Sequence, residues 1–247
     1  MSLAINATTA SGIVLAADSR QTYRNRKGMA RIGSETASKL FQLNKRIGCA
    51  ITGVAFLPEG GGIKNISVFV EEFRRKEEVE RMDVKEVVEK LTNFFDTKYN
   101  WREQLQGLRE KAKVDLNNRG FQLVGDFEEV DGVLKFKFKD QTGKEQQGRA
   151  GVDRIDIIVA GFNHDGSHEV YLCYIPGEIA KKRDSKERGR EYGAAWIGQT
   201  DVTSRIVLGW EDRILNLPFV QETIKNVDKE KIIQQLRGLE YQISWGT

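Results

Sequence analysis

An apolar run that ends abruptly in charged residues constrains this chain more than any other local feature. Residues 13–17 are all apolar, which indicates a strand buried on both faces, and Asp18 and Arg20 follow it at once. A turn at Gly12 joins this strand to the alternating segment 3–9, so the two segments are predicted to form a hairpin. Side chains two residues apart on a strand point to the same face. We therefore expect Asp18 and Arg20 to lie together at the end of a buried strand.

A second hairpin is predicted between residues 39 and 54. Residues 39–43 alternate as a strand does, residues 44–46 form a polar turn, and residues 47–54 form an apolar strand that ends at a glycine. The polar segment 22–34 between the two hairpins contains glycine and several arginines, and we interpret it as a solvated loop.

Helices are predicted after the hairpins. Three glycines at 60–62 are expected to start a helix, because apolar residues recur with helical spacing over 63–73. Asp83 is a natural N-cap, and the apolar positions over 84–95 indicate the clearest helix of the chain. The highly charged segment 105–114 is also compatible with a helix.

Strands return in the second half of the chain. Residues 133–139 alternate between apolar residues and lysine, and residues 155–161 and 170–175 form an apolar pair around a glycine turn. Residues 194–198 are typical of a short strand, and helical patterns follow from Asp201 onward. This order of elements favours an α+β fold with layered αββα architecture over alternating βαβ units.

Charge and hydropathy exclude two classes of protein. The 39 basic and 36 acidic residues leave a net charge of only +3, whereas proteins that bind nucleic acid generically are usually more basic. The basic runs 24–31 and 181–190 are therefore interpreted as solvated surface. The apolar stretches are far shorter than the roughly 18 residues of a membrane-spanning helix. We expect a soluble, unexported protein with neither nucleic-acid nor membrane partners.

The cysteines and histidines offer no framework for metal or redox chemistry. Cys49 and Cys173 lie far apart in apolar runs, as reduced, buried thiols of a cytoplasmic protein do. His164 and His168 flank a glycine-containing turn and are expected to be exposed. We expect no metal, no other cofactor and no histidine-dependent catalysis.

The Met-Ser start provides a nucleophile that needs no histidine. Cytosolic chains that begin this way normally lose Met1, which leaves the hydroxyl of Ser2 beside its own α-amino group. Such an amine has an ordinary pKa of about 7.7 to 8.0 and can accept the hydroxyl proton as a general base. Because Met-Ser starts are common, this feature gains weight only from the motifs around it.

Three motifs occur in the order typical of proteasome β subunits, which belong to the N-terminal nucleophile hydrolases. The motifs are GIVLAADSR at 12–20, KLFQL at 39–43 and IGCAITG at 47–53. The chain resembles this family most clearly over residues 2–100. The resemblance implies a four-layer αββα sandwich in a single domain, 1–247, in which residues 101–150 are an insertion without counterpart. Family members continue into two further strands, so the chain is expected to be C-terminally incomplete or to lack that supporting segment.

Two positions compete for the role of nucleophile. Counting back from Asp18 through the turn at Gly12 places Ser2, without gaps, where the family has its threonine. The alternative is Thr8–Thr9, which mimics the Thr-Thr start of the family but requires removal of a propeptide ending at Ala7. That register would delete the first predicted strand, so we prefer Ser2, a chemically competent substitute for threonine.

The resemblance implies a role for each matching residue. Ser2 attacks a peptide carbonyl, Lys39 lowers the pKa of the Ser2 amine and hydroxyl, and Asp18 orients Lys39. The N–H of Gly53 forms the oxyanion hole, and Arg20 supports the site by ion pairing. The expected substrate-binding residues are Gln21, Thr22 and Ala55, whose main chain would pair with an extended peptide together with Gly53, and Ile51, which would floor an apolar pocket.

The resemblance implies a threonine-type endopeptidase that acts on peptides or unfolded proteins. Assembly into a homo-oligomeric ring is expected from the family alone, and an ATPase partner is left open. The alternative is a catalytically silent proteasome-like subunit with a structural or assembly role, which a retained Met1 would favour because it blocks the Ser2 amine.

Overall fold

The computed structural model describes residues 2–24 and 29–199, together with residues 203, 205, 217, 220 and 222. The chain divides into two compact units, residues 1–198 and residues 199–247. The helices predicted after Asp201 fall in the second unit and lie outside the described residues, apart from the isolated positions above. The first unit has mixed helices and antiparallel sheets, so the α+β prediction is confirmed at this level.

The N-terminal hairpin forms where the sequence predicts it, but the prediction that its second strand is buried on both faces was wrong, because Val14 and Ala16 point outward from a sheet whose outer face is exposed. Strands β1 (Leu3–Thr9) and β2 (Gly12–Ala17) pair antiparallel, and β15 (Gly193–Gly198) pairs with the other edge of β1. The resulting three-stranded sheet has the order β15-β1-β2, so the chain start lies in the middle strand.

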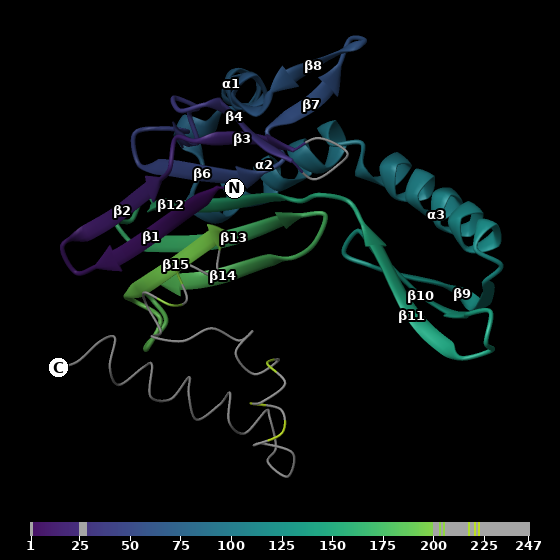
Figure 1. Cartoon of the computed structure of the whole chain (residues 1–247). Helices are drawn as coiled ribbons and strands as arrows, with labels where there is room; N and C mark the ends of the chain where they lie inside the picture. Colours follow the sequence, from purple (N-terminus) through teal and green to yellow (C-terminus); the bar gives the residue numbers. More distant parts are fainter. Residues whose placement is uncertain are drawn as a thin grey trace. The chain divides into compact units, whose positions relative to one another are not determined.

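A five-stranded sheet forms the centre of the unit (Figure 1). Its order is β14-β13-β12-β6-β5, and every neighbouring pair is antiparallel. The strands are β5 (Leu40–Gln42), β6 (Ile47–Gly53), β12 (Ile155–Phe162), β13 (His168–Ile175) and β14 (Ile179–Asp184). The predicted pairs 39–54 and 155–175 are therefore confirmed, and the register joins them through β6 and β12.

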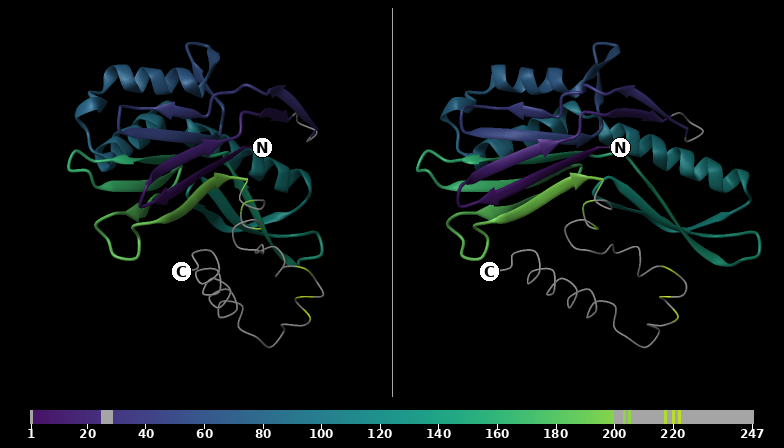
Figure 2. Two further views of the ribbon diagram at one scale, coloured as in Figure 1. Left: turned by 90° about the vertical axis from the view of Figure 1, so that its left-hand side faces the viewer. Right: turned by 60° about the vertical axis from the view of Figure 1, so that its left-hand side comes forward.

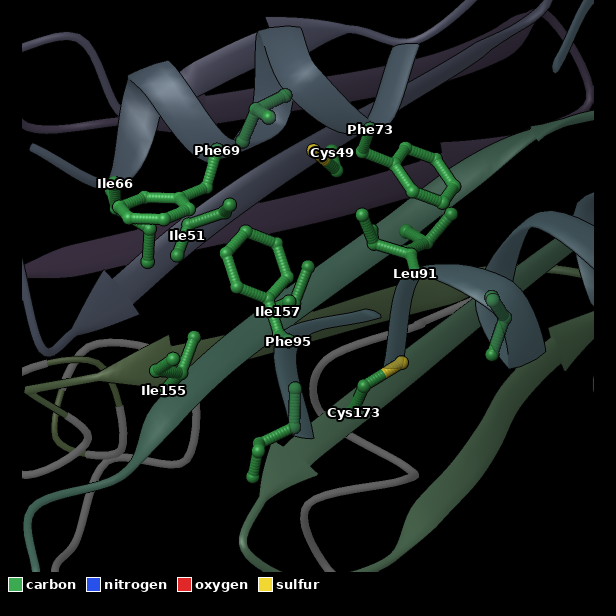
Figure 3. Packing of buried hydrophobic residues seen from close by; sticks show 14 of the residues in the cluster. Cys49, Ile51, Ile66, Phe69, Phe73, Leu91, Phe95, Ile155, Ile157 and Cys173 are labelled. Atoms are coloured by element: carbon green, nitrogen blue, oxygen red, sulfur yellow. The ribbon is translucent and has the colours of Figure 1, made fainter. Parts of the chain in front are cut away.

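Two helices cover one face of this sheet. Helix α1 (Ile66–Lys76) and helix α2 (Val84–Lys98) are joined through the short 3-10 helix η1 (Val79–Arg81). Figure 3 shows the rings of Phe69, Phe73 and Phe95 directed at strand residues such as Ile157. All of these side chains are fully buried, so this layer holds the main hydrophobic core.

The three-stranded sheet covers the other face (Figures 1 and 2). Ala4 of β1 and Ile197 of β15 pack against Ile158 of β12 and Ala50 of β6 in a second apolar cluster. Along β6 the side chains alternate between the two clusters, because successive residues of a strand point to opposite faces. Strand β6 is thus buried on both sides, as its nearly continuous apolar sequence indicates.

The segment expected to be an insertion forms a small layer of its own. Helix α3 (Trp101–Asn118) lies along a three-stranded sheet of order β11-β10-β9 (Figure 1). The strands are β9 (Gln122–Val130), β10 (Val133–Lys139) and β11 (Glu145–Gly151). The alternation in β10 is confirmed, since Leu134 is buried and the three lysines are exposed. A cleft of about 320 Å³ with Phe121, Phe136 and Phe138 in its lining opens between helix and sheet.

Two segments form hairpins that the sequence did not predict. The glycines at 60–62 were expected to start a helix, but residues 56–65 form β7 (Phe56–Glu59) and β8 (Gly62–Asn65), and helix α1 starts only after Asn65. The turn uses Gly60 and Gly61 at positive φ, where glycine is favoured, so these glycines close a hairpin and do not start a helix. Ile63 is consequently exposed.

The segment expected to be a loop also pairs. Strand β3 (Gln21–Arg24) is antiparallel to β4 (Ala30–Ser34), and residues 25–28 between them lie outside the described residues. The prediction for His168 was wrong as well, because this residue starts β13, is buried and has Nε2 2.7 Å from the carbonyl oxygen of Glu191. His164 is exposed, as expected.

Phe95→Ala tests the main core. Phe95 is fully buried between α2 and the five-stranded sheet, so its truncation should lower the free energy of unfolding by about 3 to 5 kcal/mol. Urea unfolding followed by circular dichroism measures this change. Val114→Ala is the control, because Val114 on α3 is 55% exposed and its truncation should change the value by less than about 0.5 kcal/mol. Equal effects of the two substitutions would contradict the assignment of the core.

Candidate active site

An ion pair between Asp18 and Lys39 lies at the end of the N-terminal hairpin. The ammonium nitrogen of Lys39 donates to both carboxylate oxygens of Asp18, at 2.8 and 2.9 Å, and to the carbonyl oxygen of Arg20 at 2.6 Å. The Lys39 side chain is 10% exposed and that of Asp18 is 36% exposed. The lysine is therefore held in one place, and its charge is only partly accessible to solvent.

The backbone holds the Asp18 carboxylate as well. The N–H of Leu3 donates to Oδ1 at 2.7 Å, and the N–H of Arg20 donates to Oδ2 at 3.1 Å. Partial burial acts to raise the pKa of Asp18, but the hydrogen bonds from Lys39, Leu3 and Arg20 outweigh it and lower the pKa below its ordinary value. The carboxylate is thus kept ionised and oriented toward Lys39.

Ser2 lies directly beside this ion pair through the chain itself. Its neighbour Leu3 donates to Asp18 and accepts a hydrogen bond from the N–H of Asp18 at 3.1 Å. Ser2 is partly buried at the start of β1, and Met1 lies outside the described residues. The structure therefore brings together Ser2, Asp18 and Lys39, which the sequence analysis selected.

Gly53 ends β6 next to the same group of residues. The N–H of Ile51 donates to the carbonyl oxygen of Lys39 at 2.9 Å, which ties the end of β6 to the ion pair. Gly53 is exposed and has a φ of +89°, and a Cβ atom there would overlap the carbonyl oxygen of Arg154, the residue just before β12. Glycine is therefore required by the backbone and by packing, and it leaves the main chain accessible.

The four expected substrate-binding residues differ in burial and in hydrogen bonding. Gln21 is buried at the start of β3, with Nε2 lacking a partner among the described residues, and Thr22 is partly buried on the same strand. The carbonyl oxygen of Ala55 accepts a hydrogen bond from the N–H of Ile66 at 2.9 Å, which starts α1. Ile51 is buried in the helix-side core.

Arg20 contributes through its backbone more than through its side chain. Its guanidinium pairs with Glu35 at 3.3 Å, and both side chains are exposed. Exposed pairs of this kind are worth little, so the support that Arg20 gives to the site comes mainly from its carbonyl oxygen and its N–H.

Two polar residues near this site escaped the sequence analysis. Thr52 on β6 and Asp156 on β12 are cross-strand partners, and each has a buried side-chain oxygen without a hydrogen-bond partner among the described residues. The sequence signal was a carboxylate between Ile155 and Ile157 in an otherwise apolar strand.

Among the described residues, neither the cysteines nor the basic run forms a second reactive site. Both cysteines are free and buried, as predicted, and burial raises the pKa of Cys173 to about 12, which removes it as a nucleophile at neutral pH. In the basic run 181–190, Lys181 binds Glu169 and Asp184, so much of its charge is neutralised. No group of three or more His, Cys, Asp or Glu side chains that could hold a metal occurs in the described part of the chain. In that part, no helix is long and apolar enough to cross a membrane.

Comparison with known proteins assigns no function to this site. No protein-family model matches the chain, and no curated protein matches it.

Gly53→Ala tests the close approach of β6 to Arg154. The matched control is Gly125→Ala, because Gly125 also has positive φ but has open space around its Cβ position. Both substitutions should incur the backbone strain of about 1 to 2 kcal/mol, and Gly53→Ala should be a further 1 to 3 kcal/mol or so less stable because it overpacks. Thermal unfolding of the two variants measures the difference, and equal losses would contradict the clash.

Asp18→Asn tests the ion pair through the pH dependence of stability. The pKa of Asp18 is lower in the folded protein than its ordinary 3.8, so its contribution is present above that value and is lost as pH falls through the folded pKa. The wild type should therefore be more stable than Asp18→Asn at pH 7, and the two should converge as pH falls below about 4. Urea unfolding at several pH values measures the gap. Asp126→Asn, which replaces an exposed carboxylate on β9, is the control and should change the free energy of unfolding at pH 7 by less than about 0.5 kcal/mol.

Proposed function

We propose that the chain is a peptidase of the proteasome β type that uses Ser2 as an N-terminal nucleophile after removal of Met1. The observation that carries this proposal is the placement of the Lys39 ammonium, fixed by Asp18 and the Arg20 carbonyl beside the start of β1. A purely structural ion pair at this position would not require the lysine to be partly buried. The burial is accounted for if a nearby group uses the charge of the ammonium.

The chemistry follows from an amine and a hydroxyl on one residue. The Ser2 amine takes the proton from Oγ as Oγ attacks the peptide carbonyl carbon, and it then passes this proton to the leaving amine. The Lys39 ammonium lowers the pKa of the Ser2 amine and hydroxyl by charge repulsion and by its field. The acyl-enzyme ester that forms is cleaved by water, with the same amine as the base.

The oxyanion that develops on the substrate needs a donor close to Ser2. The N–H of Gly53 would supply it, since Gly53 is exposed and its strand is tied to Lys39 through Ile51. An extended peptide would bind along the main chain of Gln21, Thr22 and Ala55. Since the Ala55 carbonyl already accepts from Ile66, that carbonyl would serve a substrate only through its second lone pair.

A four-layer αββα sandwich belongs to the same proposal. Helices α1 and α2, the five-stranded sheet and the three-stranded sheet would be three of its four layers. Assembly into a homo-oligomeric ring in the cytoplasm is proposed on the same resemblance. A silent subunit with the same fold is the alternative outcome of the experiment below.

Labelling of Ser2 by an electrophilic proteasome inhibitor tests the proposal. Intact mass should show a protein that lacks Met1 and gains one adduct, which peptide mapping places on Ser2. Ser2→Ala should lose the adduct, because the nucleophile is gone while a small residue still allows Met1 removal. Retention of Met1 without any adduct would establish the silent subunit instead.

Lys39→Ala separates catalysis from stability. The rate of adduct formation should fall by roughly 10²- to 10⁴-fold, the range for a group that assists proton transfer. Lys45→Ala, an exposed lysine in the turn before β6, is the control and should keep the wild-type rate. A Lys39→Ala variant that reacts at the wild-type rate while folding normally would refute the role of Lys39.

A further inference from the structure

Thr52 buries a hydroxyl that the fold does not satisfy. The residue is 3% exposed, and its Oγ1 has no hydrogen-bond partner among the described residues. It lies on the face of β6 opposite to Ile51, the face that meets the three-stranded sheet. An unpaired buried hydroxyl is unfavourable by about 1 to 3 kcal/mol, so its retention calls for a partner that binds there.

Asp156 presents a second unsatisfied oxygen from the adjacent strand. It is the cross-strand partner of Thr52, its side chain is 14% exposed, and its Oδ1 makes no hydrogen bond within the described residues. This oxygen forms an ion pair with Arg154, whose Nε is 3.4 Å away and whose guanidinium carbon lies 4.7 Å from the ring centre of Tyr174. Burial raises the pKa of Asp156 above its ordinary value, and the Arg154 charge opposes this only in part.

Gly198 shows how close this pair lies to the chain start. It is the register partner of Leu3, and a Cβ atom on it would overlap the carbonyl oxygen of Ser2 and lie 3.3 Å from Thr52 Oγ1. The Ser2 main chain and the Thr52 hydroxyl therefore flank the same point. The absence of a side chain at Gly198 lets the Ser2 main chain approach this closely.

We propose that Thr52 and Asp156 form a receptor for the Ser2 α-amino group, as positioning residues of the nucleophile. This inference rests on the proposed function, because the amine exists only once Met1 is removed. An ammonium has donors and no acceptor. Thr52 Oγ1 makes no hydrogen bond among the described residues, and Asp156 Oδ1 makes only the 3.4 Å ion pair with Arg154, so each can accept from the amine, the second directly or through one water.

The receptor gives the amine two opposing electrostatic neighbours. Asp156 on β12 stabilises the protonated form of the Ser2 amine and raises the pKa of the amine. Lys39, just before β5, lowers this pKa. Three further charged or titratable groups lie nearby. Arg154 pairs with Asp156 and lies over the ring of Tyr174, and Asp18 pairs with Lys39. The balance keeps the amine available both to accept a proton and to return it near neutral pH.

Titration of the Ser2 amine in the full chain tests the receptor. Acetic anhydride in trace amount acetylates an amine only when the amine is not protonated. The acetylated fraction of the N-terminal peptide is measured by mass spectrometry at a series of pH values, and it gives the midpoint of the titration of the Ser2 amine. Asp156→Asn should move this midpoint down by about one pH unit, since it removes the favourable charge. Thr52→Val should move it in the same direction by less, and Thr52→Ser should restore it.

Thr92→Val is the matched control, because Thr92 also has a buried hydroxyl without a partner in the described part of the chain, but it lies on α2. Its midpoint should equal that of the wild type. If Thr52→Val and Asp156→Asn both fold as judged by urea unfolding and both keep the wild-type midpoint, the receptor is refuted. If Asp156→Asn does not fold, the comparison of Thr52→Val with Thr52→Ser decides.

Electrophile labelling keeps the two proposals separate. Shifted midpoints in protein whose Ser2 Oγ never forms an adduct would refute the hydrolase and leave the receptor standing. Normal adduct formation with unshifted midpoints would refute the receptor and leave the hydrolase standing.

Discussion

The antiparallel pairing of β6 with β12 is the constraint on which the rest of the structure depends. Both strands are buried on both faces, so each must supply apolar side chains to the helices on one side and to the three-stranded sheet on the other. The strict alternation of a strand makes this possible only in one register, because a slip of one residue would exchange the two faces. The position of every group at the end of β6 follows from that register.

The end of this strand pair is where apolar packing gives way to polar groups. Ile51 still belongs to the core, Thr52 turns a hydroxyl toward the second sheet, and Gly53 exposes its main chain. The N-terminal hairpin brings Asp18 and the chain start to the same place, and Lys39 joins them through its backbone contact with Ile51. A site built on strand ends is held by the whole core, so its geometry is more rigid than that of a loop site.

Several predictions failed for one physical reason. The glycines at 60–62 and the segment 22–34 carry turn signals, which state that the chain changes direction but not what it pairs with afterwards. Apolar residues have helical spacing from Ile63 onward, but Ile63 itself lies in a hairpin. Pairing of β8 with β7 outweighs the local periodicity there. His168 was assigned to the turn beside it, whereas β13 extends far enough to bury it.

The sequence by itself determined the strands of both hairpins and the helix after Asp83. These elements follow from local alternation and helical spacing, which are properties of neighbouring residues. The choice of Ser2, Asp18, Lys39 and Gly53 as a site came from the resemblance of three sequence motifs to those of a known family. Only the tertiary structure decided that Thr52 and Gly198 lie beside Ser2 and that Asp156 is the cross-strand partner of Thr52. These residues are distant in sequence, and their meeting depends on sheet register and on the packing of one sheet against another, which no local pattern contains.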